Sequence, residues 1–183
     1  MQCLLLTLSM ALVCAIQARD IPQTKQDVEL PKLAGTWYSM AMVASDFSLL
    51  ETVEAPLRVN ITSLWPTPEG NLEIILHRWE HHRCVERTVL AQKTEDPAVF
   101  MVDRSRDKKD LCVGHRLDDR SYVFFCMGTT TPSADHHTMC QYLARTLEAD
   151  DKVMEEFISF LRTLPVHMWI FLDVTQAEEQ CRV

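Results

Sequence analysis

Short runs in which apolar and polar residues alternate follow one another along most of the chain. In the run 57–62 the alternation is strict, which is the period-two pattern of a half-buried strand. A Pro-rich break at 65–71 separates it from a second run at 72–77, so these two runs predict a hairpin. With a first strand around Trp37 the chain has eight predicted strands, of which the others are 84–93, 98–103, 111–117, 122–128 and 138–145.

The periodicity changes near the C-terminus. Apolar residues at 153–164 recur at three- and four-residue spacing, which predicts one amphipathic helix. Asp150 and Asp151 stand where an N-cap belongs, and Pro165 ends the helix. One such helix cannot form a core alone, so we expect it to pack on the outside of the sheet. Residues 168–173 predict a short ninth strand.

Short strands at this spacing favour an all-β fold, either a sandwich or an antiparallel up-and-down barrel. Closure of eight strands into a barrel removes the exposed sheet edges and leaves an interior that can hold one small ligand. The chain has no internal repeat and no linker between domains. We therefore expect one domain.

The first 18 residues carry no charge and contain an apolar run that ends at Ala18. This run is too short to span a bilayer and is typical of a signal peptide. Its removal leaves 183 − 18 = 165 residues, 19–183, a length suited to one domain. No later stretch is apolar enough for a membrane span, so the sequence predicts a secreted protein.

The net charge of −8 narrows the choice of partners. Phosphate binding depends on Lys and Arg, so an acidic balance argues against nucleic acid and anionic membranes. We interpret the acidity as a source of solubility.

Five cysteines remain without the leader, and an oxidising compartment should join four of them in two bridges. The sequence allows fifteen arrangements, which are five choices of free thiol times three pairings of the other four. A bridge from Cys126 to Cys140 would staple a hairpin, and one from Cys84 to Cys181 would tie the tail to the sheet.

Few residues suggest chemistry. The His-rich stretch 77–84 and the pair 136–137 follow no known zinc spacing, so we expect exposed turn residues and no metal. No catalytic triad, phosphate loop or carboxylate pair stands out. Cys112 could act as a nucleophile, but an inert buried thiol is far more frequent. We expect no cofactor and no enzyme activity.

Asn60-Ile61-Thr62 is the only N-glycosylation sequon of the chain. Alternation points Asn60 away from the face of Val59 and Ile61, so we expect room for a glycan there. Strand positions are, however, poorer acceptors than loops.

Several motifs together resemble one family. Gly35-Thr36-Trp37-Tyr38 stands on the first strand, and Arg145 is the last residue of the last predicted barrel strand before the helix. The segments 66–70, 97–100, 129–132 and 139–145 and the tail 178–181 strengthen a match that covers nearly all of the chain. In this order they resemble the lipocalins, in the branch that contains the β-lactoglobulins and glycodelins. The resemblance implies a closed barrel with one apolar cavity, and carriage rather than catalysis.

The resemblance also implies structural roles. Trp37, which follows Gly35, would lie at the closed end of the barrel with the Arg145 guanidinium stacked across it. The family's disulfides correspond to Cys84 with Cys181 and Cys126 with Cys140, which leaves Cys112 as an extra thiol.

The resemblance further implies that the inward-facing residues line a cavity for a retinoid or a fatty acid. A ligand there would be held mainly by the hydrophobic effect. The alternative is that these residues fill a packed interior. They are Leu57, Val59, Leu72, Ile74, Leu76, Val89, Val102, Val123, Phe125 and Met127.

Arg87 falls where the family keeps a lysine close to the ligand head group, and Arg78 matches a second basic position. Arg can hold a carboxylate with two hydrogen bonds, which would suit a fatty acid or retinoic acid. The alternative is that both are solvated charges at strand ends. If Arg87 contacts a carboxylate, Arg87→Ala weakens fatty-acid binding more than retinol binding, and equal losses would rule the contact out.

The charged segment 104–110 matches the loop that acts as a pH-operated lid in the β-lactoglobulins. It is two residues longer than that loop, and Asp107 is its nearest match to the lid's carboxyl group. We favour a solvated charged loop over a lid.

Three functions are compatible with these patterns. The first is a secreted carrier of a small hydrophobic molecule, as in whey. The second is a signalling glycoprotein that acts on cells of the reproductive tract through a surface receptor, and the third is a weak enzyme at Cys112. The resemblance also implies a homodimer through residues 49–52 and 168–173.

Overall fold

The computed structural model describes residues 29–55, 57–104, 107–114, 122–130, 136–164, 170–174 and 181. The leader at 1–18 lies outside these residues, so the signal peptide stays a prediction. No helix within these ranges is long and apolar enough to cross a membrane.

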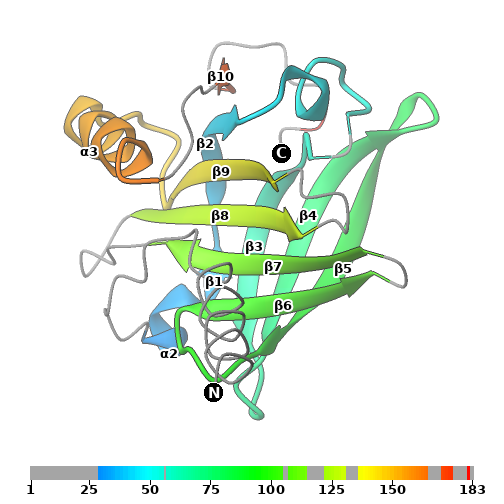
Figure 1. Cartoon of the computed structure of the whole chain (residues 1–183), viewed down its shortest axis with the longest axis vertical. Helices are drawn as coiled ribbons and strands as arrows, with labels where there is room; N and C mark the ends of the chain where they lie inside the picture. The colour runs from blue at the N-terminus through cyan, green and yellow to red at the C-terminus, as the bar shows by residue number, and fades with distance from the viewer. Residues whose placement is uncertain are drawn as a thin grey trace, which may run out of the picture.

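Antiparallel strands wrap into one closed barrel (Figure 1). They are β1 Gly35–Thr36, β2 Tyr38–Ala44, β3 Asn60–Pro66, β4 Leu72–Glu80, β5 Arg83–Lys93, β6 Val99–Arg104, β7 Asp107–Gly114, β8 Tyr122–Thr130 and β9 His136–Ala144. β1 and β2 are halves of one strand that is broken at Trp37. Because β1 pairs with β3 and β2 pairs with β9, the two ends of the sheet meet. With the broken strand counted once, the described residues form the eight barrel strands that the sequence predicted.

The structure corrects the predicted loop at 104–110. Arg104 pairs with Asp107 across the β6–β7 hairpin, so most of this charged segment is strand. The prediction relied on alternating apolar residues, whereas backbone hydrogen bonds form a ladder whatever the side chains are. β7 ends at Gly114, and residues 115–117 of the predicted run lie outside the described residues.

The hairpin of β4 and β5 extends beyond the neighbouring strands (Figure 1). β5 pairs with β4 from Arg83 to Ala91, but with β6 only from Ala91 to Lys93. At the tip His81 and His82 have positive φ values of 50° and 62°. This is the backbone of a two-residue type I′ turn, in which both central residues need positive φ.

Helix α3, Asp151–Leu161, packs on the outside of the barrel as predicted. The Asp150 carboxylate caps it by accepting from two backbone N–H groups of the first turn, at 2.9 and 3.4 Å. The ring of the buried Phe157 lies 5.0 Å from that of Phe124 and 6.2 Å from that of Tyr142, so the helix covers β8 and β9. The remaining elements are α2 Leu30–Leu33, η1 Phe47–Leu49 and β10 Ile170–Asp173, the predicted ninth strand, which pairs with β2.

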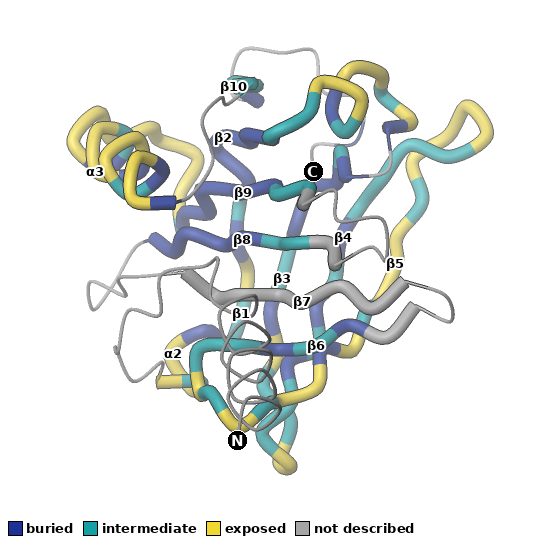
Figure 2. Tube along the Cα trace, in the orientation of Figure 1, coloured by how far each residue is buried: buried dark blue, intermediate teal, exposed yellow. Residues whose placement is uncertain are grey.

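Buried residues concentrate on β2, β8 and β9, and they alternate with partly buried ones along the first half of β4 (Figure 2). A buried polar contact joins strands where the barrel closes. The Ser39 hydroxyl donates to Gln141 Oε1 at 2.9 Å and accepts from the Ile61 N–H at 3.1 Å, while Gln141 Nε2 donates to the Val59 carbonyl at 2.9 Å. These bonds fasten β2 and β9 to β3, with which β2 shares no ladder in the described part of the chain.

Candidate ligand site in the barrel

Trp37 and Arg145 close one end of the barrel. The guanidinium carbon of Arg145 lies 3.7 Å from the centroid of the Trp37 ring. Arg145 also donates to three backbone carbonyls within residues 32–36 at 2.7 to 2.9 Å, and the Trp37 indole N–H donates to the Leu33 carbonyl at 2.8 Å. Gly35 has a φ of 111°, and a Cβ there would lie 3.2 Å from Arg145 Nη1. The structure therefore has the stack that the resemblance implied.

Most of the predicted lining residues come together inside the barrel. Seven are buried in one cluster, and Val89 and Met127 are partly buried against it. Leu57 precedes β3 and is buried in a second cluster with Met42 and Leu50. The seven are Val59, Leu72, Ile74, Leu76, Val102, Val123 and Phe125.

The exposure of this inward face rises toward one end of the barrel. On β5, Ala91, Val89 and Arg87 lie opposite the buried apolar residues at 72–76 of β4 and share their face. Ala91 is fully buried, Val89 is partly buried, and the Arg87 side chain is 54% exposed. On this wall the exposure of the inward side chains therefore rises with distance from Trp37.

Three charged side chains lie on the inward face at the end of β4 and β5 away from Trp37. Arg78 and Glu80 follow Leu76 at two-residue steps on β4, and Arg87 pairs with Leu76 in an uninterrupted ladder. Glu80 Oε1 lies 3.1 Å from Arg78 Nε, an ion-pair distance, although the angle is not that of a hydrogen bond. Glu80 Oε2 accepts a short hydrogen bond from Arg87 Nη2, and Arg87 Nε donates to Glu80 Oε1 at 3.4 Å.

We call this group, Arg78, Glu80 and Arg87, the mouth triad. The hydrogen bond from Arg87 lowers the pKa of the Glu80 carboxyl group, and the same bond raises the pKa of Arg87. Both groups are therefore charged at neutral pH, and the triad carries one net positive charge beside an apolar wall.

The sequence pointed to both arginines of the mouth triad, but Glu80 was missed. The signal was present, because the alternation that places Leu72, Ile74 and Leu76 inward places residues 78 and 80 on the same face. The pattern did not show that the Glu80 carboxylate would form an ion pair with Arg87.

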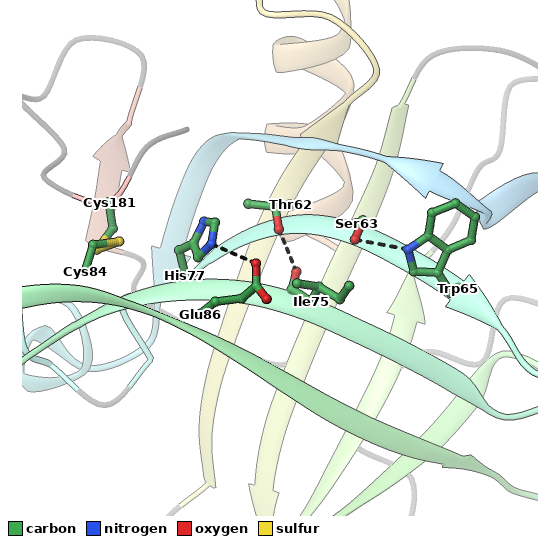
Figure 3. Close-up of polar contacts among 8 residues, drawn as sticks. All are labelled: Thr62, Ser63, Trp65, Ile75, His77, Cys84, Glu86 and Cys181. Carbon is green, nitrogen blue, oxygen red and sulfur yellow. Dashed lines mark hydrogen bonds and ion pairs between the residues drawn. A yellow bond between two sulfur atoms is a disulfide. The ribbon is translucent and has the colours of Figure 1, made fainter.

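The other face of the same strands points away from the interior (Figure 3). There His77 Nε2 lies 3.3 Å from Glu86 Oε2, and the Trp65 side chain is 47% exposed. The disulfide between Cys84 and Cys181 lies on this face beside the hairpin (Figure 3).

Asn60 also points away from the interior, since it pairs with His77. It is nevertheless only 5% exposed, and its Oδ1 has no hydrogen-bond partner among the described residues. The expected room for a glycan is therefore wrong for the folded chain. Strand alternation distinguishes the inside of a barrel from its outside, but it does not say what packs against the outside.

Both predicted disulfides are present, and Cys126 and Cys140 are direct partners in the β8–β9 ladder. Cys112 lies on β7 opposite Cys126, and its thiol lies outside the described side chains. In the part of the chain that the structure describes, no three His, Cys, Asp or Glu side chains gather as metal ligands do.

Comparison with known proteins identifies the family. The model of the Lipocalin / cytosolic fatty-acid binding protein family matches residues 34–178. The chain is a lipocalin. Binding of small hydrophobic ligands is typical of lipocalins.

Three relatives match over most of their length. Glycodelin of Homo sapiens is 55% identical over 183 residues, which are all of this chain and 99% of glycodelin. Beta-lactoglobulin-2 of Equus caballus is 51% identical over 181 residues, 99% of each chain. Beta-lactoglobulin-2 of Felis catus is 54% identical over 163 residues, 89% of this chain and 99% of that protein.

A solved structure supports the fold independently. Odorant Binding Protein OBP1 superposes with a TM-score of 0.66 over 85% of this chain and 100% of its own, at 18% identity. At this level of identity the likeness concerns the barrel alone.

Proposed function

We propose that this lipocalin is a secreted carrier that binds a small hydrophobic ligand, a retinoid or a fatty acid, inside its barrel. The proposal rests on the burial of the side chains on the inward face, which decreases with distance from Trp37. Apolar side chains are fully buried near Trp37, yet Val89 on the same wall is only partly buried. In an interior packed solid to the rim, an inward valine next to buried Ile74 would be buried as well.

The ligand would be held chiefly by removal of apolar surface from water. A side chain of the size of Leu or Val contributes about 1.5–3 kcal/mol when it is fully buried, so a few contacts along this wall suffice for micromolar affinity. The mouth triad would face the polar end of the ligand.

Retinol titration tests the proposal, with quenching of tryptophan fluorescence as the measurement. Val89→Arg puts a charge on the inward wall, while Thr88→Arg puts the same charge on the outer face of the same strand. We expect the first variant to weaken retinol binding by at least tenfold and the second to leave it within twofold. Absence of binding to the unaltered protein, or equal effects of the two variants, would refute a ligand site in the barrel.

Secretion forms part of the proposal. It is supported by the apolar leader at 1–18 and by two disulfides, which form in oxidising compartments. Expression in cultured mammalian cells tests it, since the protein should be recovered from the medium with residues 19–183 alone.

A glycodelin-like signalling role is the second candidate, and the 55% identity to human glycodelin favours it. It would require a cell-surface receptor. Saturable binding of the labelled, lipid-free protein to cells would support this role, and binding that disappears when the protein is pure would exclude it.

A homodimer also belongs to the proposal. β10 is an edge strand of the described sheet, and its Phe171 side chain is 46% exposed. Phe171→Lys should shift sedimentation toward the monomer, whereas an unchanged sedimentation coefficient would exclude this edge as the interface.

A further inference from the structure

Three cysteines lie in one row across three neighbouring strands. Cys126 on β8 pairs with Cys140 on β9 on one side and with Cys112 on β7 on the other. Direct partners in a ladder lie on the same face of a sheet, so the backbone places all three on one face. The two disulfides use four of the five cysteines that follow the leader, and the fifth is Cys112. A disulfide and a further cysteine therefore lie side by side in the sheet.

The backbone around Cys126 is compatible with a bridge on either side. The Cα atoms of Cys126 and Cys140 lie 4.0 Å apart, which is the close spacing of a non-hydrogen-bonded pair. Because the N–H and C=O groups of one residue turn to the same neighbouring strand, Cys126 forms a hydrogen-bonded pair with Cys112, for which the Cα spacing is about 5.5 Å. Disulfides usually join Cα atoms about 4.4–6.8 Å apart, so this spacing also permits a bridge.

The two bridges would close loops of the same length. Cys112 and Cys126 are 126 − 112 = 14 positions apart, and Cys126 and Cys140 are 140 − 126 = 14 positions apart. In the chain-entropy model the stabilisation by a disulfide depends on the length of its loop, so loop closure favours neither bridge. The balance between them is then set by the packing of the folded chain.

We propose that Cys112 exchanges with the disulfide between Cys126 and Cys140, so that the folded protein interconverts between two disulfide isomers. The Cys112 thiolate attacks Sγ of Cys126, a bond between Cys112 and Cys126 forms, and the bond between Cys126 and Cys140 breaks. Cys140 leaves as a thiolate and takes a proton from water, and the proton of Cys112 goes to water. One disulfide replaces another, so the step needs no oxidant and no reductant.

The order of the three cysteines suits this step. Displacement at a disulfide places the attacking and the leaving sulfur on opposite sides of the sulfur that is attacked, and Cys112 and Cys140 stand on opposite sides of Cys126 in the row. The exchange leaves the thiol on Cys140, which is fully buried in the cluster that contains Phe157 of α3. A thiol there is shielded from external disulfides and oxidants, because their reaction requires access.

Two matched substitutions test the geometry, after refolding of each reduced chain under the same oxidising conditions. Cys140→Ser and Cys126→Ser break the same disulfide, and each leaves two cysteines of the row. In Cys140→Ser these two are on neighbouring strands, so we expect a new bridge and no free thiol in the denatured monomer. In Cys126→Ser they are two strands, roughly 9–10 Å, apart, which is too far for a bridge, so we expect two free thiols. Thiol titration with DTNB measures both.

The unaltered protein tests the exchange itself. It is incubated at about pH 8.5, where thiols are partly ionised, and digested with pepsin at about pH 2, where loss of the thiolate stops further exchange. Mass spectrometry should find a peptide linked through Cys112 and Cys126 beside the one linked through Cys126 and Cys140. Because the two loops are equal, we expect the amounts of the two linked peptides to agree within about tenfold.

Either experiment can overturn the proposal. Two free thiols in Cys140→Ser would refute the geometry, and absence of the peptide linked through Cys112 and Cys126 from the unaltered protein would refute the exchange. The second experiment decides the matter even where a serine variant does not fold. Neither result depends on ligand binding, since the cysteine row lies outside the proposed ligand site.

Discussion

Arg145, which directly follows β9, lies over the indole ring of Trp37, with 3.7 Å between the guanidinium carbon and the ring centroid. The two residues come from strands that adjoin only because the barrel is closed. The stack and its three hydrogen bonds to backbone carbonyls join α2, β1 and β9 at the closed end. The charged mouth triad lies at the opposite end of the inward face.

Arg145→Lys should lower the free energy of unfolding by about 2–4 kcal/mol, because lysine keeps the charge but loses the planar stack and most of the donors. Urea denaturation at an unchanged slope measures this loss. Arg162→Lys, at the exposed C-cap of α3, is the control and should cost less than about 0.5 kcal/mol. Equal losses in both variants would contradict a special role for Arg145.

Gly35→Ala should destabilise the protein more than Gly70→Ala. Both glycines have positive φ, 111° and 84°, so each substitution strains the backbone by about 1–2 kcal/mol. A Cβ at residue 35 also lies 3.2 Å from Arg145 Nη1, which belongs to a side chain held by three hydrogen bonds, whereas at residue 70 it meets the flexible Lys93 side chain at 3.3 Å. Urea midpoints compare the two, and a larger effect at Gly70 would be the contrary result.

Removal of the disulfides one at a time should have unequal effects. Cys84 and Cys181 close a loop of 97 residues, and Cys126 and Cys140 close one of 14. Chain entropy predicts losses of about 4.7 and about 3 kcal/mol for paired Cys→Ala substitutions. Unfolding by urea measures both, and a reversed order would show that native contacts outweigh the loop term.

Asn60 should carry no glycan in the folded protein, because its side chain is only 5% exposed. Mass spectrometry of the disulfide-bonded protein from mammalian cells checks this. Thr62→Ala removes the sequon without altering Asn60, so its mass should differ from that of the unaltered protein by the substitution alone. A glycan on Asn60 in protein with both bridges intact would contradict the burial.

Local pattern was enough for much of the fold. Alternation predicted the strands because a strand exposes its two faces to different surroundings at every second residue. It missed the first half of β7, where Asp107–Asp110 pair through the backbone although the sequence there has no apolar pattern. The helix was predicted well because its cap at Asp150 and its apolar stripe both lie within one short segment.

The sequence by itself determined the succession of short strands along the chain, the outside helix and which residues share the inward face, and the family resemblance added the two bridges. The tertiary structure decided that Glu80 holds Arg87 across the hairpin and that Asn60 is covered. The physical reason is that the two-residue period of a strand fixes only the face on which each side chain lies. Its partners and its burial depend on which distant segments of the chain pack beside it.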